Sequence, residues 1–552
     1  MRGSADPERP LLIVAASLAA VVTLLLARDT LLPGLGFWDT AEAQVVPPVL
    51  GTFHPTGFPA YAILGWLASV VLQPFGDPAF RMNLLSAILA AGAAALAVVV
   101  VRQLIGHTIL ALAVALVLGA VPVVWRIASH ADAHMLHLFL VALVMVLLVG
   151  WERRSRARDP QRDRWLVAAA IVYGVSLGNH TLTLLLAPGI ALFVLAVEPR
   201  TYRRPRLIAA VAGSLAATVV LLYLQLPLRA GPFRAPLVYG DPSTWDGFRY
   251  VVFAEQFRSS LYMPFDRLPE KVVDLVRFGG EQLGPLLVLV PFGFAVALAR
   301  HRAYAILTGV GFAVTAWFSA SYVNAEIERY YLVPVLFAAT WVAILAGAAL
   351  DAVVAVALPP APRPALPPAT DGGIPPVTAE SRPASVRHSA GLPPARGTGA
   401  LGIGALVIEV ALGATLIAPT VQALPERRDS VDQSRNTAAT TWSRAALASV
   451  EPDAIIVSWW SYSTTLWYAQ IIEGLRPDVW ILDDRTRLDL NLGDITDVID
   501  AQRGRRPVYL VRLDASELVR LEATYELERI EMPTEQSLLR VIAPRQAERT
   551  QP

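Results

Sequence analysis

Residues 11–42 read LLIVAASLAAVVTLLLARDTLLPGLGFWDTAE. The first part, Leu11 to Ala27, contains no charged residue, and the stretch ends with Asp39 and Glu42 in a polar segment. A helix needs about 20 predominantly apolar residues to cross a bilayer. The run follows a short arginine-containing N-terminus, as a cleavable signal peptide does. We expect an uncleaved signal-anchor instead, because the chain continues directly into the polar segment that carries its most informative motifs.

The composition of the whole chain extends this pattern. The 552 residues are 55% hydrophobic and 16% charged, and the mean hydropathy is +0.50. A soluble protein carries roughly 25% charged residues. Further apolar runs predict an α-helical polytopic membrane protein with about eleven transmembrane helices. The expected spans are residues 11–31, 82–102, 108–125, 133–151, 165–179, 182–197, 207–227, 284–299, 303–320, 331–350 and 400–419.

Several classes of structure and function are disfavoured at this stage. The formal net charge of +1 gives no reason to expect a nucleic-acid partner. The absence of cysteine excludes disulfides, thiolate metal sites and cysteine nucleophiles. The apolar segment 57–72 is short and begins with proline-containing turns, so we expect it to be interfacial or re-entrant and not to cross the membrane.

The arginines indicate the orientation in the membrane, because cytoplasmic loops carry an excess of basic residues. If the N-terminus is cytoplasmic, the loop 152–164 is cytoplasmic too, and it holds six arginines. The next loops on that side, 200–206 and 300–302, are also rich in arginine. We therefore expect a multi-pass protein of the plasma membrane whose intervening loops, the first of which holds Asp39, are extracytoplasmic.

The same topology divides the chain into four parts. Residues 1–350 form the transmembrane domain, and the proline-rich residues 351–399 are expected to be a cytoplasmic linker. Residues 400–420 are the final span, and residues 421–552 are expected to fold as an extracytoplasmic α/β domain. Its expected elements are strands at Ala454–Val457, Val479–Leu482 and Val508–Val511 and a helix at Thr464–Glu473. No glycine-rich phosphate loop is found there, so we do not expect a nucleotide site.

The first outer loop carries the strongest candidate for catalysis. Asp39 and Glu42 are three residues apart, so in a helix they would share a face. His54 follows in the same short loop. A partly desolvated carboxylate just outside the bilayer is suited to act as a general base toward a hydroxyl group. The alternative interpretation is a solvated loop in which the aspartate caps a helix.

The second outer loop reads His130-Ala131-Asp132-Ala133-His134. These side chains could form a divalent metal site together with Asp39 or His54. The alternative is that Asp132 caps the following helix and that the histidines lie at the membrane interface. The spacing matches no common metal signature, so we predict substrate-binding roles for His130 and Asp132 and leave the metal as the alternative.

The remaining outer loops add polar residues to the same side. Arg329 lies at the mouth of a span, where its guanidinium is suited to an anionic lipid phosphate because it binds two oxygens and stays charged when desolvated. It could instead only snorkel to the interface. Glu409 is an exception within a span, where a charge costs about 3 kcal/mol, and we expect it to be protonated or paired. The other candidate substrate-binding residues are Asn179, His180, Arg229, Asp241 and Tyr330.

These motifs resemble a known family. Asp39-Thr40-Ala41-Glu42 and the segment 54–59, His-Pro-Thr-Gly-Phe-Pro, are similar to the D-S-G-E and H-P-P-G-Y-P elements of a domain-of-unknown-function family. That family belongs to the glycosyltransferase-C clan and includes an animal protein O-mannosyltransferase. Further matches are Arg81–Ser86, Ser176–His180, Leu226–Arg229, Gly240–Pro242, Arg329–Pro334 and, in the tail, Gly474–Val479. The chain departs from the family at Thr40-Ala41 and Thr56, and at residues 131–134 it has Ala-Asp-Ala-His where the family often has A-E-V-Y.

The resemblance implies a membrane enzyme of glycosyltransferase-C type. Such an enzyme transfers a sugar from a polyprenyl-phosphate donor to a hydroxyl group of a protein, glycan or lipid, with inversion. Asp39 would be the base, Glu42 and His54 would position the acceptor or the sugar, and Arg329 with Arg229 would hold the phosphate. Two other functions stay open: a transporter or flippase, which needs polar residues along the membrane midplane, and a non-catalytic envelope assembly protein.

Overall fold

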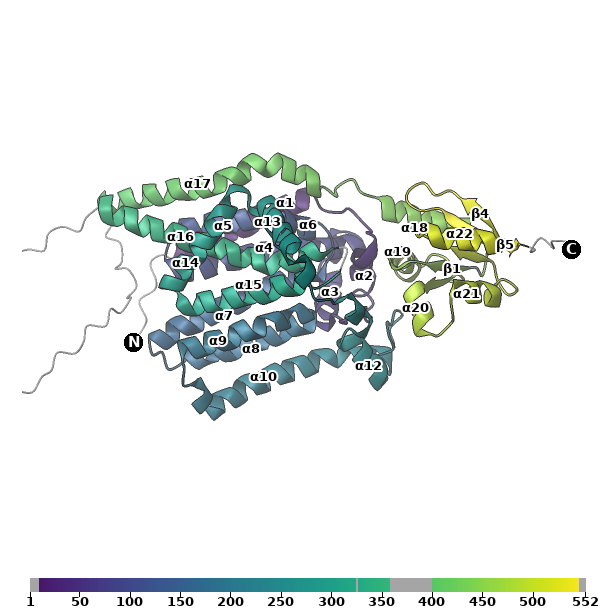
Figure 1. Cartoon of the computed structure of the whole chain (residues 1–552), viewed down its shortest axis with the longest axis horizontal. Helices are drawn as coiled ribbons and strands as arrows, with labels where there is room; N and C mark the ends of the chain where they lie inside the picture. Colours follow the sequence, from purple (N-terminus) through teal and green to yellow (C-terminus); the bar gives the residue numbers. More distant parts are fainter. Residues whose placement is uncertain (1–8, 324–325, 358–399, 546–552) are drawn as a thin grey trace, which may run out of the picture.

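The computed structural model describes residues 9–323, 326–357 and 400–545. Long helices lie side by side in a bundle, and a small α/β domain stands at one end of it (Figure 1). The greater part of the segment that we expected to be a linker, residues 358–399, lies outside the described residues. The chain is therefore an α-helical polytopic membrane protein with a C-terminal α/β domain.

Most helices of the bundle follow one another with short connections, and three longer segments interrupt the series. They are α1 (Arg9–Asp29), α4 (Pro78–Ile105), α5 (Thr108–Gly119), α6 (Pro122–Ala128), α7 (Ala133–Arg156), α8 (Arg162–Asn179), α9 (Ala187–Val197), α10 (Pro205–Tyr223), α14 (Val290–Arg300), α15 (Arg302–Ala320), α16 (Leu332–Ala357) and α17 (Ala400–Val431). Shorter elements gather mainly at the end nearer the C-terminal domain: α2 (Trp38–Val45), α3 (Pro59–Val71), η2 (Thr181–Leu186), α11 (Gln225–Ala230), α12 (Trp245–Val252), η4 (Glu255–Ser260), α13 (Leu268–Leu283), η6 (Gly284–Leu289) and η7 (Ile327–Tyr331).

Fewer helices meet the requirements for a membrane span than the eleven expected. Within the described ranges, eight helical stretches are long and apolar enough to cross a bilayer, and nine if the bent pair α5–α6 is one span. The expected spans 165–179 and 182–197 are helical, but α8 opens with Arg162-Asp163-Arg164 and the segment Thr181–Val197 is shorter. Helix α3 has 13 residues and so a length of about 20 Å, which agrees with the expectation that residues 57–72 do not cross.

Glu409 has a clear role in this bundle. Its side chain, on α17, accepts hydrogen bonds from the backbone N–H of Ile109 at 3.0 Å and of Leu110 at 3.5 Å, in the first turn of α5. Its second oxygen lies 3.8 Å from Nδ1 of His107. The first amides of a helix have no partner within it. A buried carboxylate from α17 therefore satisfies the start of α5 and ties the two helices together.

The C-terminal domain contains a five-stranded sheet of order β2-β1-β3-β5-β4. Its elements are α18 (Ala438–Ser449), β1 (Ile455–Ser458), α19 (Trp460–Ile471), β2 (Trp480–Asp483), α20 (Asp484–Asp489), α21 (Ile495–Gln502), β3 (Val508–Leu510), α22 (Ala515–Thr524), β4 (Tyr525–Ile530) and β5 (Leu538–Pro544). The three expected strands and the helix are confirmed. Strands β4 and β5 were not predicted. Strand β4 reads Tyr-Glu-Leu-Glu-Arg-Ile, so half of its residues are charged, and it directly continues a charged helix.

Strands β1, β2 and β3 run parallel, so their carboxyl ends share one edge of the sheet. That edge leads into α19, which packs against α2 of the membrane domain (Figure 1). Phe37, just before α2, contacts Trp442 and Tyr462 edge-on. The hydroxyl of Tyr468 accepts a hydrogen bond from the backbone N–H of Ala79 at 3.0 Å. Helix α17 continues to Val431, past the end expected at residue 420, and brings the chain to this interface.

We predict that Glu409→Ala lowers the midpoint of thermal unfolding of the purified protein in detergent. The substitution leaves two amide groups without an acceptor, and each such loss costs about 1–3 kcal/mol. Glu409→Gln keeps an acceptor oxygen at the same position and serves as the matched control, with a smaller decrease. Equal midpoints for Glu409→Ala and the wild type would contradict this assignment.

Candidate functional site

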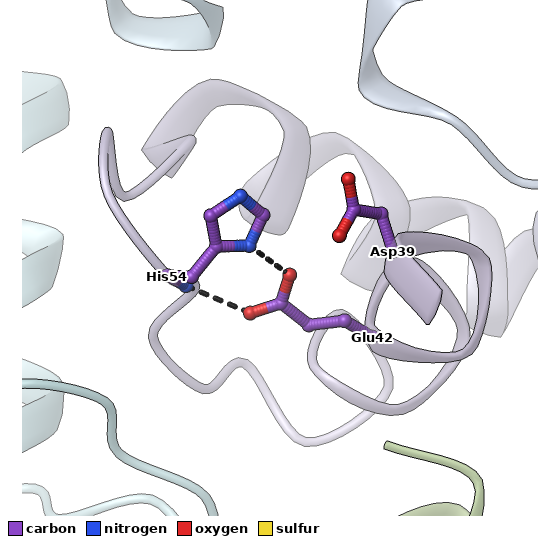
Figure 2. A group of neighbouring side chains, drawn as sticks. All are labelled: Asp39, Glu42 and His54. Atoms are coloured by element: carbon purple, nitrogen blue, oxygen red, sulfur yellow. Dashed lines mark hydrogen bonds and ion pairs between the residues drawn. The ribbon is translucent and has the colours of Figure 1, made fainter. Parts of the chain in front are cut away.

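Asp39, Glu42 and His54 meet in the first loop of the chain. Helix α2 begins at Trp38, which places Asp39 in its first turn and Glu42 one turn later. Glu42 is buried, and its Oε1 accepts a hydrogen bond from the backbone N–H of His54 at 2.7 Å. Its Oε2 is hydrogen-bonded to Nδ1 of the His54 ring (Figure 2). The expected common face of the two carboxylates is confirmed, and both point toward the histidine.

Burial and charge set the protonation of this group. Burial raises the pKa of Glu42 above its usual value, although the His54 ring opposes the shift. Burial alone would lower the pKa of His54, but the carboxylates of Glu42 and Asp39 outweigh it and raise that pKa. Burial would also raise the pKa of Asp39, yet the nearby Arg329 guanidinium holds it below the usual range. The lowered pKa keeps Asp39 ionised at neutral pH.

Arg329 joins three loops of the membrane domain. It lies in η7, at the start of the long apolar helix α16, and its side chain is only 8% exposed. One terminal nitrogen donates to Oδ2 of Asp39 at 2.7 Å, and the other donates to Oδ2 of Asp132 at 3.3 Å. The second nitrogen also lies 3.2 Å from a carboxylate oxygen of Glu326. One guanidinium thus balances three acidic side chains at one point of the molecule.

Asp132 has the capping role that we offered as an alternative and also takes part in the site. It is the N-cap of α7 and accepts a hydrogen bond from the backbone N–H of His134 at 2.6 Å. The same oxygen lies 2.8 Å from Nδ1 of the His134 ring. Burial opposes its ionisation, but His134 and Arg329 hold the pKa of Asp132 far below its usual value. It is therefore a fixed anion that orients Arg329.

The metal set that we considered, His130, Asp132 and His134 with a residue of the first loop, is not the one that converges. Among the described residues, the possible ligand atoms that lie within 4.8 Å of one another belong to Asp39, Glu42 and His54. All four carboxylate oxygens of this group already accept hydrogen bonds from protein groups. A cation would have to displace those donors, so we assign no metal to the group.

A cavity of about 790 Å³ opens beside Asp39. One part of its wall is polar and charged, and the other is apolar. The polar part includes Asp39, His54, His134, His180, Arg329 and Tyr330. The apolar part includes Leu182, Leu184, Leu185, Phe253, Leu261 and Phe318. Ligand pockets are usually apolar with a few placed polar groups, and this division suits a molecule with a charged headgroup and a hydrocarbon tail.

Several predicted residues lie elsewhere. Asn179 donates to the carbonyl of Ala133 at 2.9 Å and supports the start of α7. Arg229 donates to the carbonyls of Val49 and Leu50 at 3.1 and 2.9 Å, so it holds the first loop in shape and does not line the cavity. Asp241 and His130 are also absent from the cavity wall, and Asp241 accepts a hydrogen bond from Ser243 at the surface.

Known proteins resemble this chain in sequence and in fold. Residues 39–203 match the sequence profile of the family described as "Protein O-mannosyl-transferase TMEM260 N-terminal domain". This segment is therefore similar to that family. The chain is also 32% identical over 252 residues to the mouse "Protein O-mannosyl-transferase TMEM260". The match covers 44% of this chain and 34% of the mouse protein, so the chain corresponds to about a third of the length of that relative.

Solved structures share the fold of the TMEM260-like segment and of the chain around it. The apo structure of ArnT from Cupriavidus metallidurans matches with a TM-score of 0.57 and 12% identity, over 96% of this chain and 98% of that one. ArnT bound to undecaprenyl phosphate matches with a TM-score of 0.53 and 14% identity, over the same shares. The oligosaccharyltransferase AglB from Archaeoglobus fulgidus, in complex with an inhibitory peptide and a dolichol-phosphate, matches at 0.50 and 11%, over 99% of this chain and 75% of that one. The fold is therefore of the glycosyltransferase-C type.

Two residues of the site lie outside the TMEM260-like segment and were missed by sequence reasoning. Nε1 of Trp460 donates to Oδ1 of Asp39 at 3.1 Å, and its ring packs edge-on against His54 at 5.5 Å. Arg485 lines the cavity and donates to the hydroxyl of Tyr250 at 2.8 Å. Trp460 follows the carboxyl end of β1, and Arg485 follows that of β2. Ligand sites of α/β sheets lie at those ends, which was the signal that sequence reasoning had available.

We predict that Trp460→Phe loosens the contact between the C-terminal domain and α2. The variant keeps an aromatic ring but loses a hydrogen bond to a charged acceptor, a bond typically worth about 1.5–3 kcal/mol. Trypsin cleavage after Arg435, an exposed residue between α17 and α18, should become several-fold faster. Trp467→Phe on the same helix is the matched control and should cleave at the wild-type rate. Equal rates for Trp460→Phe and the wild type would show that this hydrogen bond does not hold the interface.

Proposed function

We propose that this chain is a membrane glycosyltransferase that moves a sugar from a polyprenyl-phosphate donor to a hydroxyl group, in the manner of a protein O-mannosyltransferase. The observation that carries the proposal is the ion pair between Asp39 and Arg329 at the polar end of a cavity whose other wall is apolar. The pair combines a base for the acceptor and a cation for the leaving phosphate in one place.

The cavity fits the donor by its chemistry. The apolar wall would take the first isoprene units, and the polar end would take the phosphate and the sugar. The bound lipid in the ArnT structure is an undecaprenyl phosphate and that in AglB a dolichol-phosphate, which supports the same class of donor here. Aromatic side chains at the polar end, including Tyr330 and Trp460, offer flat surfaces for a sugar ring.

The transfer follows from the positions of the charged groups. The acceptor hydroxyl attacks the anomeric carbon, its proton passes to Asp39, and the bond from that carbon to the phosphate oxygen breaks. Polyprenyl phosphate leaves with the electron pair, and Arg329 compensates the negative charge that it gains. A single displacement of this kind inverts the anomeric centre. Glu42 and His54 hold the loop that carries Asp39, and the indole N–H of Trp460 orients the second carboxylate oxygen of Asp39.

Arg329 also couples donor binding to the strength of the base. Without a donor, its two terminal nitrogens are engaged by three carboxylates. A phosphate that binds Arg329 competes with Asp39 for the same nitrogen. Asp39 then loses the charge that lowers its pKa and becomes the stronger base. In this proposal the donor phosphate binds Arg329 in place of Asp39. Once the donor is bound, the ion pair no longer lowers the pKa of Asp39.

The proposal places the site on the extracytoplasmic side. The arginine-rich loops 152–164 and 200–206 lie at the opposite end of the bundle from α2 and the C-terminal domain (Figure 1). The positive-inside rule assigns the arginine-rich end to the cytoplasm. Asp39 and the C-terminal domain would then face the compartment in which polyprenyl-linked sugars are presented to secreted or envelope acceptors.

We predict that Asp39→Asn lowers sugar transfer by about 10²–10⁴-fold, the usual effect of removing a general base. Binding of the donor, tested with polyprenyl-phosphate-mannose, should not weaken, because loss of the Asp39 charge frees a nitrogen of Arg329 for the phosphate. Arg329→Gln should instead weaken donor binding. The assay is transfer of labelled mannose into envelope material from a deletion strain, and Asp241→Asn, which removes an exposed carboxylate, is the control. Wild-type transfer by Asp39→Asn would refute the assignment of the base.

We predict opposite labelling of two single cysteines in intact cells. The chain has no native cysteine, so Trp245→Cys on α12 and Arg158→Cys in the basic loop can each be probed alone. An impermeant maleimide should label position 245 directly and position 158 only after permeabilisation. Labelling of both positions from the same side would overturn the proposed orientation.

A further inference from the structure

A second cavity lies at the other end of the bundle, between α8 and α10. It has a volume of about 760 Å³. Its polar end is formed by Asp163 and Arg164 at the start of α8 and by Arg204 and Arg206 at the start of α10. Helix α10 has 19 residues and so spans about 28 Å. Helix α2, which carries Asp39, lies toward the opposite end of the bundle (Figure 1). This cavity, which we call the α8–α10 groove, is therefore separate from the site of Asp39.

The groove has an apolar wall that faces the membrane. Val167, Ala168 and Ile171 line it from one face of α8. Leu207 and Ala210 line it from α10. Helix α10 lies at the edge of the bundle, and Leu207 is its only buried residue in the described structure. The groove therefore opens toward the hydrocarbon of a surrounding bilayer, with its basic end at the height of the headgroups.

The charges of the groove are unequally matched. Arg204 is paired with Asp163 and with Glu198, at 3.2 Å from an oxygen of each. Arg164 and Arg206 are exposed and form no ion pair with any side chain that the structure describes. Arg162 also lies within 4 Å of both acids, so the four groups balance one another. Arg164 and Arg206 thus flank a neutral cluster at the mouth of an apolar groove. The complementary ligand has an anionic head and an acyl chain.

We propose that the α8–α10 groove binds an anionic glycerophospholipid, with its phosphate between Arg164 and Arg206 and an acyl chain along Val167, Ile171 and Leu207. Guanidinium groups bind phosphate oxygens in pairs and stay charged when partly desolvated. Basic pockets between membrane helices on the cytoplasmic side hold such headgroups. This lipid site is separate from the proposed donor site, because the groove and the cavity of Asp39 lie at opposite ends of the bundle.

Native mass spectrometry of the full-length protein with dioleoyl phosphatidylglycerol tests the proposal. The wild type should retain this lipid in preference to dioleoyl phosphatidylcholine. The double variant Arg164→Gln/Arg206→Gln should bind it about tenfold more weakly or worse. The matched control is Arg158→Gln/Arg302→Gln, which removes the same charge from exposed positions outside the groove and should keep wild-type affinity. An equal loss in both double variants, or a loss in neither, would overturn the proposal.

A second variant tests the apolar half of the site without changing a charge. Ala210 is exposed on α10 and lines the groove, so Ala210→Phe should fold normally and fill part of the apolar wall. We expect it to reduce phosphatidylglycerol binding several-fold. Undiminished binding in Ala210→Phe, together with displacement of the lipid by millimolar inorganic phosphate, would show a simple anion site and overturn the assignment to a lipid.

Discussion

The contact between Arg329 and the carboxylates of Asp39 and Asp132 organises the functional end of this molecule. It connects three loops that are far apart in the sequence. The side chains of Arg329 and Asp132 are almost completely buried. A buried charge without a partner is strongly destabilising, so the loops can fold together only if these groups find one another. The same constraint places Asp39, the proposed base, beside the guanidinium of Arg329.

The C-terminal domain is part of this arrangement and not an appendage. The carboxyl ends of its parallel strands β1 and β2 face the membrane domain, and the residues that follow them, Trp460 and Arg485, line the cavity. Trp460 reaches Asp39 itself. Asp39 therefore has one oxygen held from the membrane domain and the other from the C-terminal domain. Any movement between the two domains changes the surroundings of the proposed base.

The two ends of the bundle differ in their charged side chains. At the end near α2, acidic and aromatic side chains surround one buried arginine. At the other end, arginines outnumber acidic groups and leave a basic groove against lipid. Both ends offer a cation to a phosphate next to apolar walls. In the first, the proposed base Asp39 lines the cavity, whereas Asp163 of the groove is paired with Arg204. This difference supports one end as a site of chemistry and the other as a site of lipid binding.

The sequence by itself determined the class of fold, the positions of the long apolar helices of the bundle and the common face of Asp39 and Glu42. Long apolar runs, local spacing and the distribution of arginines are properties that neighbouring residues specify. Only the tertiary structure decided which distant groups meet: Arg329 reaches Asp39, Arg229 is used by backbone carbonyls, and Glu409 satisfies the start of α5. Those partners depend on how helices far apart in the chain pack, and hydrophobic periodicity contains no information about which side chains will be opposite one another.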